Sequence, residues 1–310
     1  MAHGGKLTAV RTIAFDGRAL ASPAGGVRRY VTELFGALAA AHPEVRWVGI
    51  GAPCMHDVSD ARHPEWYPGD LDPLRRWFYR RSATSAARIV TDSTFSRDEI
   101  VAAYGVDAAR IHVVPLAAGP GFIPGPSGTI RTPTVLHVGD LHPRRNLSML
   151  LDVVIALRRS HPALARLVLR LIGTDRGIAS ALTTQAAGAG HADALQVDGV
   201  IAESALVQAY QTATVLAYPS QYEGFGLPLL EAMACGTPVV ASRAASMPEV
   251  VGDAGILVAP TDRQAWFTHL RRVCTDMAVA RTMTDAGYTR AATFTWARTA
   301  DLTFAVYRSL

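Results

Sequence analysis

One stretch of the sequence, residues 215–241, constrains the fold more than any other. It begins with a short apolar run, 215–218, which suits a parallel strand that is buried on both faces. A glycine loop follows, and Pro228 then stands where a first helical turn tolerates a missing backbone N–H. Gly236 would end that helix, and 237–241 has the pattern of another strand. The stretch therefore predicts strand, loop, helix and strand, as in α/β proteins.

The loop inside this stretch predicts an anion-binding site. Gly224 and Gly226 let backbone N–H groups approach a ligand closely, and the following helix adds unpaired N–H groups and the positive end of its dipole. Glu223 in the loop and Glu231 about one turn into the helix frame this site. Solvation or the helix dipole would explain one glutamate. The pair beside the glycines favours carboxylates that accept hydroxyl groups of a sugar or ribose.

The stretch resembles the glutamate-pair motif of retaining glycosyltransferases, in particular glycosyltransferase family 4. The resemblance implies that Glu231 holds the ribose of a nucleotide sugar and that Glu223 contacts the donor sugar and takes part in catalysis. It also implies that N–H groups of the loop contact sugar and phosphate. The loop residues expected to bind the donor are Glu223, Gly224, Phe225, Gly226 and Leu227.

Composition sets the broad class of the protein. The 310 residues suggest about two domains, and with 49% hydrophobic and 18% charged residues the chain can bury sizeable cores. A net charge of +4 argues neither for nor against nucleic acid, and the motifs give no reason to expect a nucleic-acid partner. Three scattered cysteines, Cys54, Cys235 and Cys274, offer neither a metal site nor a disulfide framework. Without a membrane-length apolar run or a signal-peptide core, the expected location is cytoplasmic.

The N-terminal part predicts another α/β unit with its own glycine loop. Residues 12–17 have the pattern of a strand, 22–26 of a glycine loop, and 27–41 of a helix. Gly25 and Gly26 would then form a second anion cradle, although a plain tight turn explains the pair alone equally well. The resemblance places such a glycine pair near the donor phosphates.

Residues 55–59, Met-His-Asp-Val-Ser, resemble the family's His-Asp-Leu-Ser element. In the family its histidine and aspartate lie where donor and acceptor meet, which implies catalytic roles for His56 and Asp57. A lone His–Asp pair is otherwise more often a hydrogen bond within a loop. Family members carry further strand and helix before this element, so the sequence predicts an abbreviated N-terminal domain.

Two further N-terminal segments have alternative interpretations. Residues 70–72, Asp-Leu-Asp, resemble a metal-binding aspartate pair of another glycosyltransferase fold, but they lie in a Pro- and Gly-rich loop. We therefore expect a helix entry there and no metal. Residues 74–81 mix aromatic and basic side chains, as helices at a membrane surface do. A helix that covers the sheet with its arginines outward is the simpler interpretation.

The pattern restarts after a linker. Residues 88–93 and 111–115 are expected strands of the first domain, and Ser93 is well suited to cap the helix that follows it. The Pro- and Gly-rich segment 119–133 predicts the linker. A new strand is expected over 134–139.

Two arginines follow this strand. Arg145 takes the place of the family's lysine on the donor diphosphate, so the resemblance implies that Arg144 and Arg145 bind the diphosphate and that Arg145 acts in catalysis. Adjacent arginines are ordinarily solvated, but a place at the carboxyl end of a strand favours phosphate binding. Asp140 stands where some relatives carry a second cation. Gly199 and Val200 match the turn where the family's nucleotide base docks.

Together these elements predict two Rossmann-like α/β domains that face each other across a cleft, the GT-B arrangement, with the N-terminal domain abbreviated. The expected boundaries are an acceptor-side domain over 1–118, the linker over 119–133, a nucleotide-sugar domain over 134–290 and a C-terminal helix over 291–310 that crosses back. The resemblance implies metal-independent transfer of a hexose, with mannose as one candidate, from a nucleotide diphosphate sugar to an acceptor hydroxyl, with retained anomeric configuration.

The expected partners are the nucleotide sugar donor, as co-substrate without a further cofactor, and a glycan, lipid-linked or small-molecule acceptor. A lipid-linked acceptor would bring the protein to the inner face of the membrane as a peripheral contact. Two other functions stay open. A donor-binding protein without chemistry would bind the nucleotide sugar but not turn it over, and an epimerase or phosphorylase on the same fold would be recognised by its products.

Overall fold

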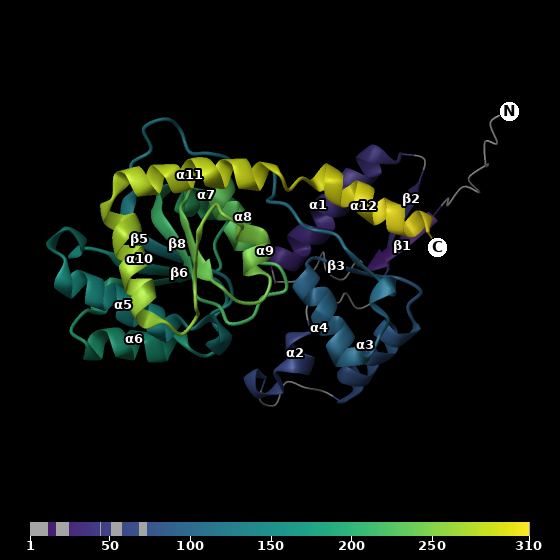
Figure 1. The fold of residues 1–310 in the computed structure, drawn as a ribbon, viewed down its shortest axis with the longest axis horizontal. Helices are drawn as coiled ribbons and strands as arrows, with labels where there is room; N and C mark the ends of the chain where they lie inside the picture. Colours follow the sequence, from purple (N-terminus) through teal and green to yellow (C-terminus); the bar gives the residue numbers. More distant parts are fainter. Residues whose placement is uncertain (1–11, 17–24, 44, 51–57, 68–72, 310) are drawn as a thin grey trace.

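The computed structural model describes residues 12–16, 25–43, 45–50, 58–67 and 73–309. The chain forms two α/β parts that lie side by side, and Figure 1 shows the first in purple and blue and the second in teal, green and yellow. No helix among the described residues is long and apolar enough to cross a membrane.

The second part is built on a six-stranded parallel sheet in the order β10-β9-β8-β5-β6-β7. This is the strand order of a Rossmann sheet, in which the direction of winding reverses between the first and fourth strands, here β5 and β8. The strands are β5 (Thr132–Val138), β6 (Val168–Ile172), β7 (Leu195–Gly199), β8 (Ala213–Tyr218), β9 (Val239–Ser242) and β10 (Ile256–Val258).

Helices cover both faces of this sheet because its strands are apolar on both sides. Val135 and Val240 face one core, while their neighbours Leu136 and Val239 face the other. The first core is closed by α5 (Leu147–Ser160), α6 (Ala179–Gly188) and α10 (Arg263–Thr275). The second is closed by α7 (Glu203–Thr212), α8 (Leu227–Ala234), α9 (Met247–Val251) and α11 (Met277–Ala292). Single 3-10 turns occupy Pro143–Arg145, Pro162–Leu164 and Ala192–Ala194.

The first part contains two parallel strand pairs, β1 with β2 and β3 with β4. Helices α1 and α4 connect the strands of each pair, as βαβ units require. No ladder joins the two pairs within the residues described. The elements are β1 (Thr12–Asp16), α1 (Gly25–Ala41), β2 (Arg46–Ile50), α2 (Ser59–Arg62), α3 (Pro73–Ser85), β3 (Ile89–Thr91), α4 (Thr94–Tyr104) and β4 (Ile111–Val113), with 3-10 turns at Pro64–Trp66 and Ala108–Arg110.

Two element boundaries differ from the sequence prediction. Helix α1 begins at Gly25, so the glycine pair forms the first helical turn instead of ending the loop. Strand β5 begins at Thr132, inside the segment predicted as linker. Both shifts are two residues long, which is the range over which local patterns do not define the ends of elements.

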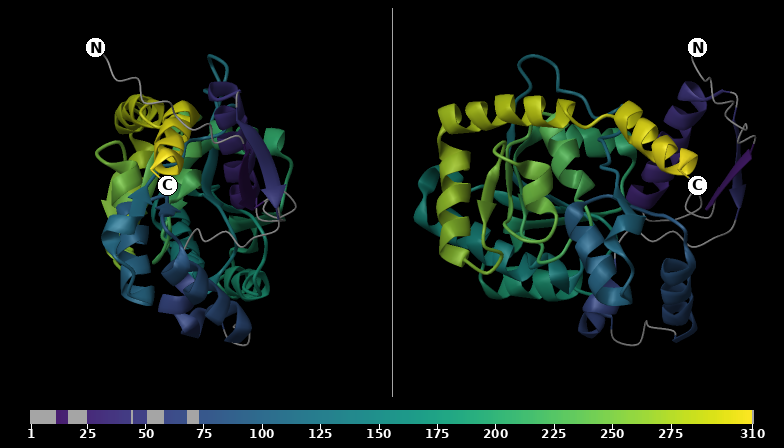
Figure 2. Two further views of the ribbon diagram at one scale, coloured as in Figure 1. Left: turned by 90° about the vertical axis from the view of Figure 1, so that its right-hand side faces the viewer. Right: turned by 45° about the vertical axis from the view of Figure 1, so that its right-hand side comes forward.

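The last helix, α12 (Trp296–Arg308), leaves the second part and packs against the first. Figures 1 and 2 show it as the yellow helix that continues from α11 and lies along α1. Leu34, Leu38 and Ala300 form a common buried cluster, and the Phe304 ring stacks on His42 with centroids 3.6 Å apart. The apolar faces of α1 and α12 thus cover each other, although the two helices come from opposite ends of the sequence.

Strands β5 and β6 approach each other closely at their carboxyl ends. Gly139 and Gly173 follow the two strands with φ angles of 138° and 149°, which side chains rarely allow. A Cβ atom on Gly173 would lie 2.0 Å from the carbonyl oxygen of Gly139. The loops that leave this edge therefore depend on a residue without a side chain.

We expect Gly173→Ala to lower the free energy of unfolding by more than about 2 kcal/mol, because the new methyl group adds a backbone clash to an unfavourable φ angle. Urea denaturation measures this change. Gly188→Ala is the control, since Gly188 ends a helix and nothing lies within 4 Å of its added Cβ. Equal stability of the two variants would contradict the close approach.

Candidate functional site

The predicted site residues gather at the carboxyl ends of β5 and β8. Arg145 ends the 3-10 turn that follows β5, and Glu223 lies in the loop that follows β8. These are the two strands between which the winding of the sheet reverses. The loops diverge at such a point, so ligands of doubly wound sheets bind there.

Arg145 is the centre of this site. Its side chain is buried, and its Nη1 atom lies against the Glu223 carboxylate, the Tyr218 hydroxyl and Ser220 Oγ, the last at 3.1 Å. Burial has the largest single effect and lowers the pKa of Arg145, but the Glu223 carboxylate and the Tyr218 hydroxyl together outweigh it and raise the pKa above its ordinary value. A surface arginine is thus the wrong interpretation for Arg145. It is a fixed, fully charged donor.

Gly139 leaves room for this guanidinium. A Cβ atom there would lie 3.1 Å from Nη2 of Arg145. The first residue after β5 therefore has a packing reason to lack a side chain, in addition to its φ angle of 138°.

A histidine and a tyrosine support the pair from the sheet. His137 on β5 stacks on Tyr218 at the end of β8, with ring centroids 5.2 Å apart. Its Nδ1–H donates to the carbonyl of Ala217 at 3.1 Å. Burial, with a smaller contribution from the charge of Arg145, lowers the pKa of His137 to about 3. Burial likewise raises the pKa of Tyr218, so both rings are neutral. The sequence indicated neither residue, because each lies within an apolar strand pattern.

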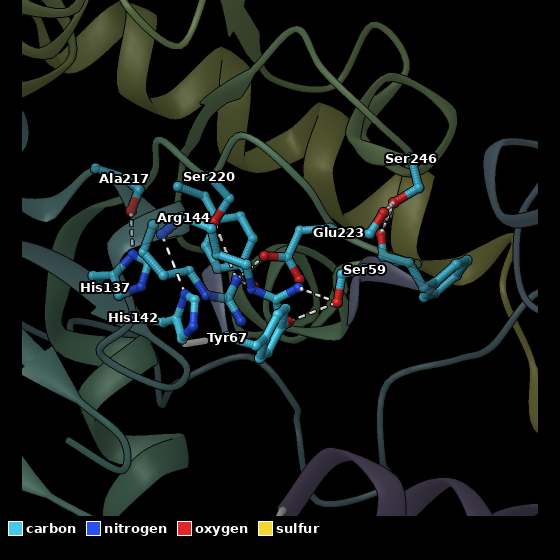
Figure 3. A network of polar contacts seen from close by, with 12 residues as sticks. Ser59, Tyr67, His137, His142, Arg144, Ala217, Ser220, Glu223 and Ser246 are labelled. Carbon is cyan, nitrogen blue, oxygen red and sulfur yellow. Dashed lines mark hydrogen bonds and ion pairs between the residues drawn. The ribbon is translucent and has the colours of Figure 1, made fainter. Parts of the chain in front are cut away.

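The carbonyl groups of the glycine loop are held by side-chain hydroxyls. Ser246 Oγ donates to the carbonyls of Glu223 and Phe225, both at 2.9 Å. Ser93 and Ser96 donate to the carbonyl of Gly224, at 2.5 and 3.0 Å. Figure 3 shows the contacts from His137 to Ser246. Hydrogen bonds therefore fix three consecutive loop carbonyls, those of Glu223, Gly224 and Phe225.

Fixed carbonyls also fix the neighbouring N–H groups, because a trans peptide points its C=O and N–H in opposite directions. The N–H groups of Gly224, Phe225 and Gly226 must point away from the serines. Within the described part of the chain, neither these groups nor the N–H of Leu227 has a hydrogen-bond partner. The four residues are buried. Since buried N–H groups are rarely left unpaired, this arrangement suits a ligand with several acceptor oxygens.

Glu231 is positioned differently from Glu223. It lies one turn into α8 and is only 2% exposed, and its Oε2 accepts a hydrogen bond from the hydroxyl of Tyr210 on α7 at 2.8 Å. The two glutamates that the sequence places around one loop thus have different side-chain partners, one a guanidinium and the other a phenol.

Arg144 reaches the first part of the chain. Its Nη1 lies 3.4 Å from Ser59 Oγ, which in turn shares a hydrogen bond of 2.7 Å with the hydroxyl of Tyr67. The Tyr67 ring lies 5.3 Å from that of His142, and burial followed by the charge of Arg144 lowers the pKa of His142. Figure 3 shows this group beside Glu223.

Of the other predicted site residues, His56 and Asp57 lie outside the described residues, although Ser59 ends the same sequence element beside Arg144. Gly25 and Gly26 form the first turn of α1. Gly199 ends β7 with a φ angle of 65°, and Val200 after it is exposed. In the described part of the chain, no hydrogen bond or ion pair joins Gly199 or Val200 to the Arg145–Glu223 pair.

Asp140, which stands where some relatives carry a second cation, takes part in a surface ion pair. Asp140 pairs with Arg176 at 2.9 Å, and both side chains are partly exposed. Among the described residues, no group of three or more His, Cys, Asp or Glu side chains is arranged to hold a metal ion.

The depressed pKa of His137 predicts a loss of stability in acid. In the unfolded chain His137 takes up a proton near pH 6.5, whereas in the folded chain it does so only near pH 3. Stability therefore falls as the pH drops through this window. For this one group the loss is about 1 kcal/mol between about pH 8 and about pH 5.5. Urea denaturation should show that His137→Leu flattens the profile by this amount. A variant that is shifted equally at every pH would contradict the assignment.

Comparison with known proteins identifies the class of this chain. Residues 132–276 match the family described as Glycosyl transferases group 1, and residues 31–117 match the Glycosyl transferase 4-like domain. The chain is 33% identical over 274 residues to O-antigen chain mannosyltransferase B of Escherichia coli, which covers 83% of this chain and 69% of that protein. The chain belongs to the family-4-like glycosyltransferases of group 1.

Further relatives agree with this assignment. D-inositol 3-phosphate glycosyltransferase of Actinosynnema mirum is 32% identical over 240 residues, which are 72% of this chain and 57% of that protein. The chain thus spans 69% and 57% of the lengths of these two relatives. The crystal structure of Anabaena Alr3699/HepE in complex with UDP and glucose has a TM-score of 0.70 at 20% identity, over 91% of this chain and 76% of that one. The predicted GT-B arrangement of two Rossmann-like domains is confirmed.

Proposed function

We propose that the chain transfers a hexose from a nucleotide diphosphate sugar to an acceptor hydroxyl, with retention at the anomeric carbon and without a metal ion. The observation that carries the proposal is the row of four N–H groups from Gly224 to Leu227, which have no partner among the described residues and lie beside the buried guanidinium of Arg145. Such groups bind the oxygens of a diphosphate through charge-assisted hydrogen bonds.

In this mechanism the site stabilises the negative charge that develops on the departing diphosphate. The acceptor hydroxyl oxygen forms a bond to the anomeric carbon on the face that the diphosphate leaves, while the bond between that carbon and the phosphate oxygen breaks. The leaving phosphate oxygen takes the acceptor proton. Arg144, Arg145 and the loop N–H groups hold the diphosphate, and the Glu223 carboxylate accepts a hydroxyl of the donor sugar. The proposal keeps the catalytic roles that the family resemblance gives His56 and Asp57, which lie outside the described residues.

Mannose is one candidate for the sugar, because a relative at 33% identity is named a mannosyltransferase. Another relative is named for D-inositol 3-phosphate, so the acceptor varies within the family. For this chain we propose a glycan, lipid-linked or small-molecule acceptor, with the nucleotide sugar as the only other partner.

The deciding experiment is calorimetric titration with UDP, GDP and their hexose conjugates, followed by an assay for sugar release and by NMR of the product's anomeric configuration. Turnover of one conjugate with retained configuration supports the proposal, and an inverted product contradicts retention. Added chelator should leave the rate unchanged. Binding without transfer to any acceptor or to water would favour the alternative, a nucleotide-sugar-binding remnant of this fold.

Glu231→Gln is expected to weaken binding of the preferred nucleotide by more than about tenfold, because ribose hydroxyls lose a charged acceptor worth about 1.5–3 kcal/mol. The 2′,3′-dideoxy nucleotide lacks both hydroxyls, so its affinity should be the same for the variant and the unaltered chain. Asp285→Asn, with the same charge change at an exposed position of α11, is the control. Equal losses for both nucleotides would contradict the ribose assignment.

Helix α3 supports a peripheral contact with the inner face of the membrane. Its Trp77 and Phe78 are 60% and 42% exposed, and Arg76, Arg80 and Arg81 are exposed on the same helix. Exposed aromatic rings beside arginines bind the interface of anionic bilayers, where the rings enter the headgroup region and the charges attract the lipids. The simpler interpretation, arginines turned to solvent above a buried face, does not account for the exposed rings.

Replacing both Trp77 and Phe78 by serine should reduce binding to phosphatidylcholine vesicles that contain phosphatidylglycerol by about tenfold in sedimentation. Ile130→Ser is the matched control, because Ile130 is an exposed apolar residue on the linker side of the second domain. Omission of phosphatidylglycerol or added salt should weaken binding of the unaltered chain. Undiminished binding by the double variant would contradict the membrane contact.

A further inference from the structure

The first turn of helix α4 binds the second domain through one carboxylate. The backbone N–H groups of Thr94 and Phe95 donate to Oε2 and Oε1 of Glu249, both at 2.8 Å. The first N–H groups of a helix have no partner inside the helix and lie at the positive end of its dipole. Glu249, on α9, therefore completes the end of a helix that belongs to the other domain.

The same turn holds the glycine loop that follows β8. Ser93 and Ser96 each donate to the carbonyl of Gly224, at 2.5 and 3.0 Å, and both serines are buried. Ser93 is also the N-cap of α4, because its hydroxyl oxygen accepts from the N–H of Ser96 at 3.0 Å. One turn of the first domain is thus bonded to two separate segments of the second.

Tyr222, the residue before Glu223, adds an aromatic contact to this interface. Its ring meets that of Phe95 edge to face with centroids 5.0 Å apart, and its hydroxyl donates to Oε2 of Glu99 on α4 at 3.3 Å. We call the contacts of Ser93–Ser96 with Tyr222, Gly224 and Glu249 the clasp.

The clasp has a direct consequence for the loop. Because the peptide between Gly224 and Phe225 is planar and trans, holding the Gly224 carbonyl fixes the opposite direction of the Phe225 N–H. Ser246 of the second domain fixes the N–H groups on either side through the carbonyls of Glu223 and Phe225. The middle one of three N–H groups is therefore oriented by the first domain.

We propose that Ser93, Ser96 and Glu249 are positioning residues, which orient the Phe225 N–H toward the donor only while the two domains are clasped. Donor binding and clasping then strengthen each other by the same factor. The functional meaning of this coupling rests on the proposed function, but the clasp itself is tested without any ligand.

Amide hydrogen exchange at Thr94 and Phe95 reports the clasp, since these N–H groups have their partner in the other domain. Glu249→Gln should speed exchange at both, because an amide offers one acceptor oxygen where the carboxylate offers two. Asp253→Asn is the matched control, with the same charge change at an exposed position four residues further along. Exchange that is equally fast in the unaltered chain and in Glu249→Gln would overturn the clasp.

Ser96→Ala tests the positioning role, because the only side-chain bond of Ser96 among the described residues goes to the Gly224 carbonyl. The nucleotide's Kd should rise about fivefold, as for one lost hydrogen bond. Bound nucleotide should slow exchange at Thr94 and Phe95 in the unaltered chain but not in Ser96→Ala. Ser85→Ala, which loses a hydroxyl bond within α3, should behave as the unaltered chain.

The outcomes separate the two proposals. If UDP, GDP and their hexose conjugates all fail to bind the unaltered chain, the proposed function fails. The difference in amide exchange between the unaltered chain and Glu249→Gln still tests whether the clasp exists. If a nucleotide binds and Ser96→Ala matches the unaltered chain in both Kd and coupled exchange, the positioning role is overturned.

Discussion

The structure of the site depends on the burial of one guanidinium. A buried charge costs several kcal/mol unless it is paired and hydrogen-bonded, and Arg145 is both, through Glu223, Tyr218 and Ser220. The titratable rings beside the Arg145–Glu223 ion pair add no further charge to it. His137 and Tyr218 are neutral because of their shifted pKa values. The pair therefore fixes the junction of β5 and β8 without an uncompensated charge.

Much of this architecture follows from local sequence. The glycines, Pro228 and the flanking apolar runs predict β8, the loop and α8, and the restart of the pattern predicts the β5 turn that carries Arg145. Both predictions depend on neighbouring residues, whose φ angles and apolar periodicity act over a few positions. Local sequence could not predict the side-chain partners of Glu223 and Glu231. Glu231 contacts Tyr210 because α7 packs on α8, a tertiary contact that no local pattern encodes.

The serines that hold the loop carbonyls show even more clearly that local sequence does not predict tertiary contacts. Ser93 was predicted as a helix cap, and it is one, because capping is local. Its second bond, to the carbonyl of Gly224, joins residues 131 positions apart. Serine hydroxyls are generic donors, so neither Ser93 nor Ser246 has a sequence signature for this role. Only the packing of the two domains brings them to the loop carbonyls.

These contacts bear on the choice between a transferase and a binding remnant. Arg145 is neutralised by Glu223, so in the proposed function Arg144 and the loop N–H groups would also have to meet the charge of a diphosphate. Arg144 lies against Ser59, and the Phe225 N–H is oriented through α4. Both supports come from the first domain. A remnant that only bound nucleotide would need the second domain alone, whereas retained contacts at these two points favour a chain that still closes over its donor for chemistry.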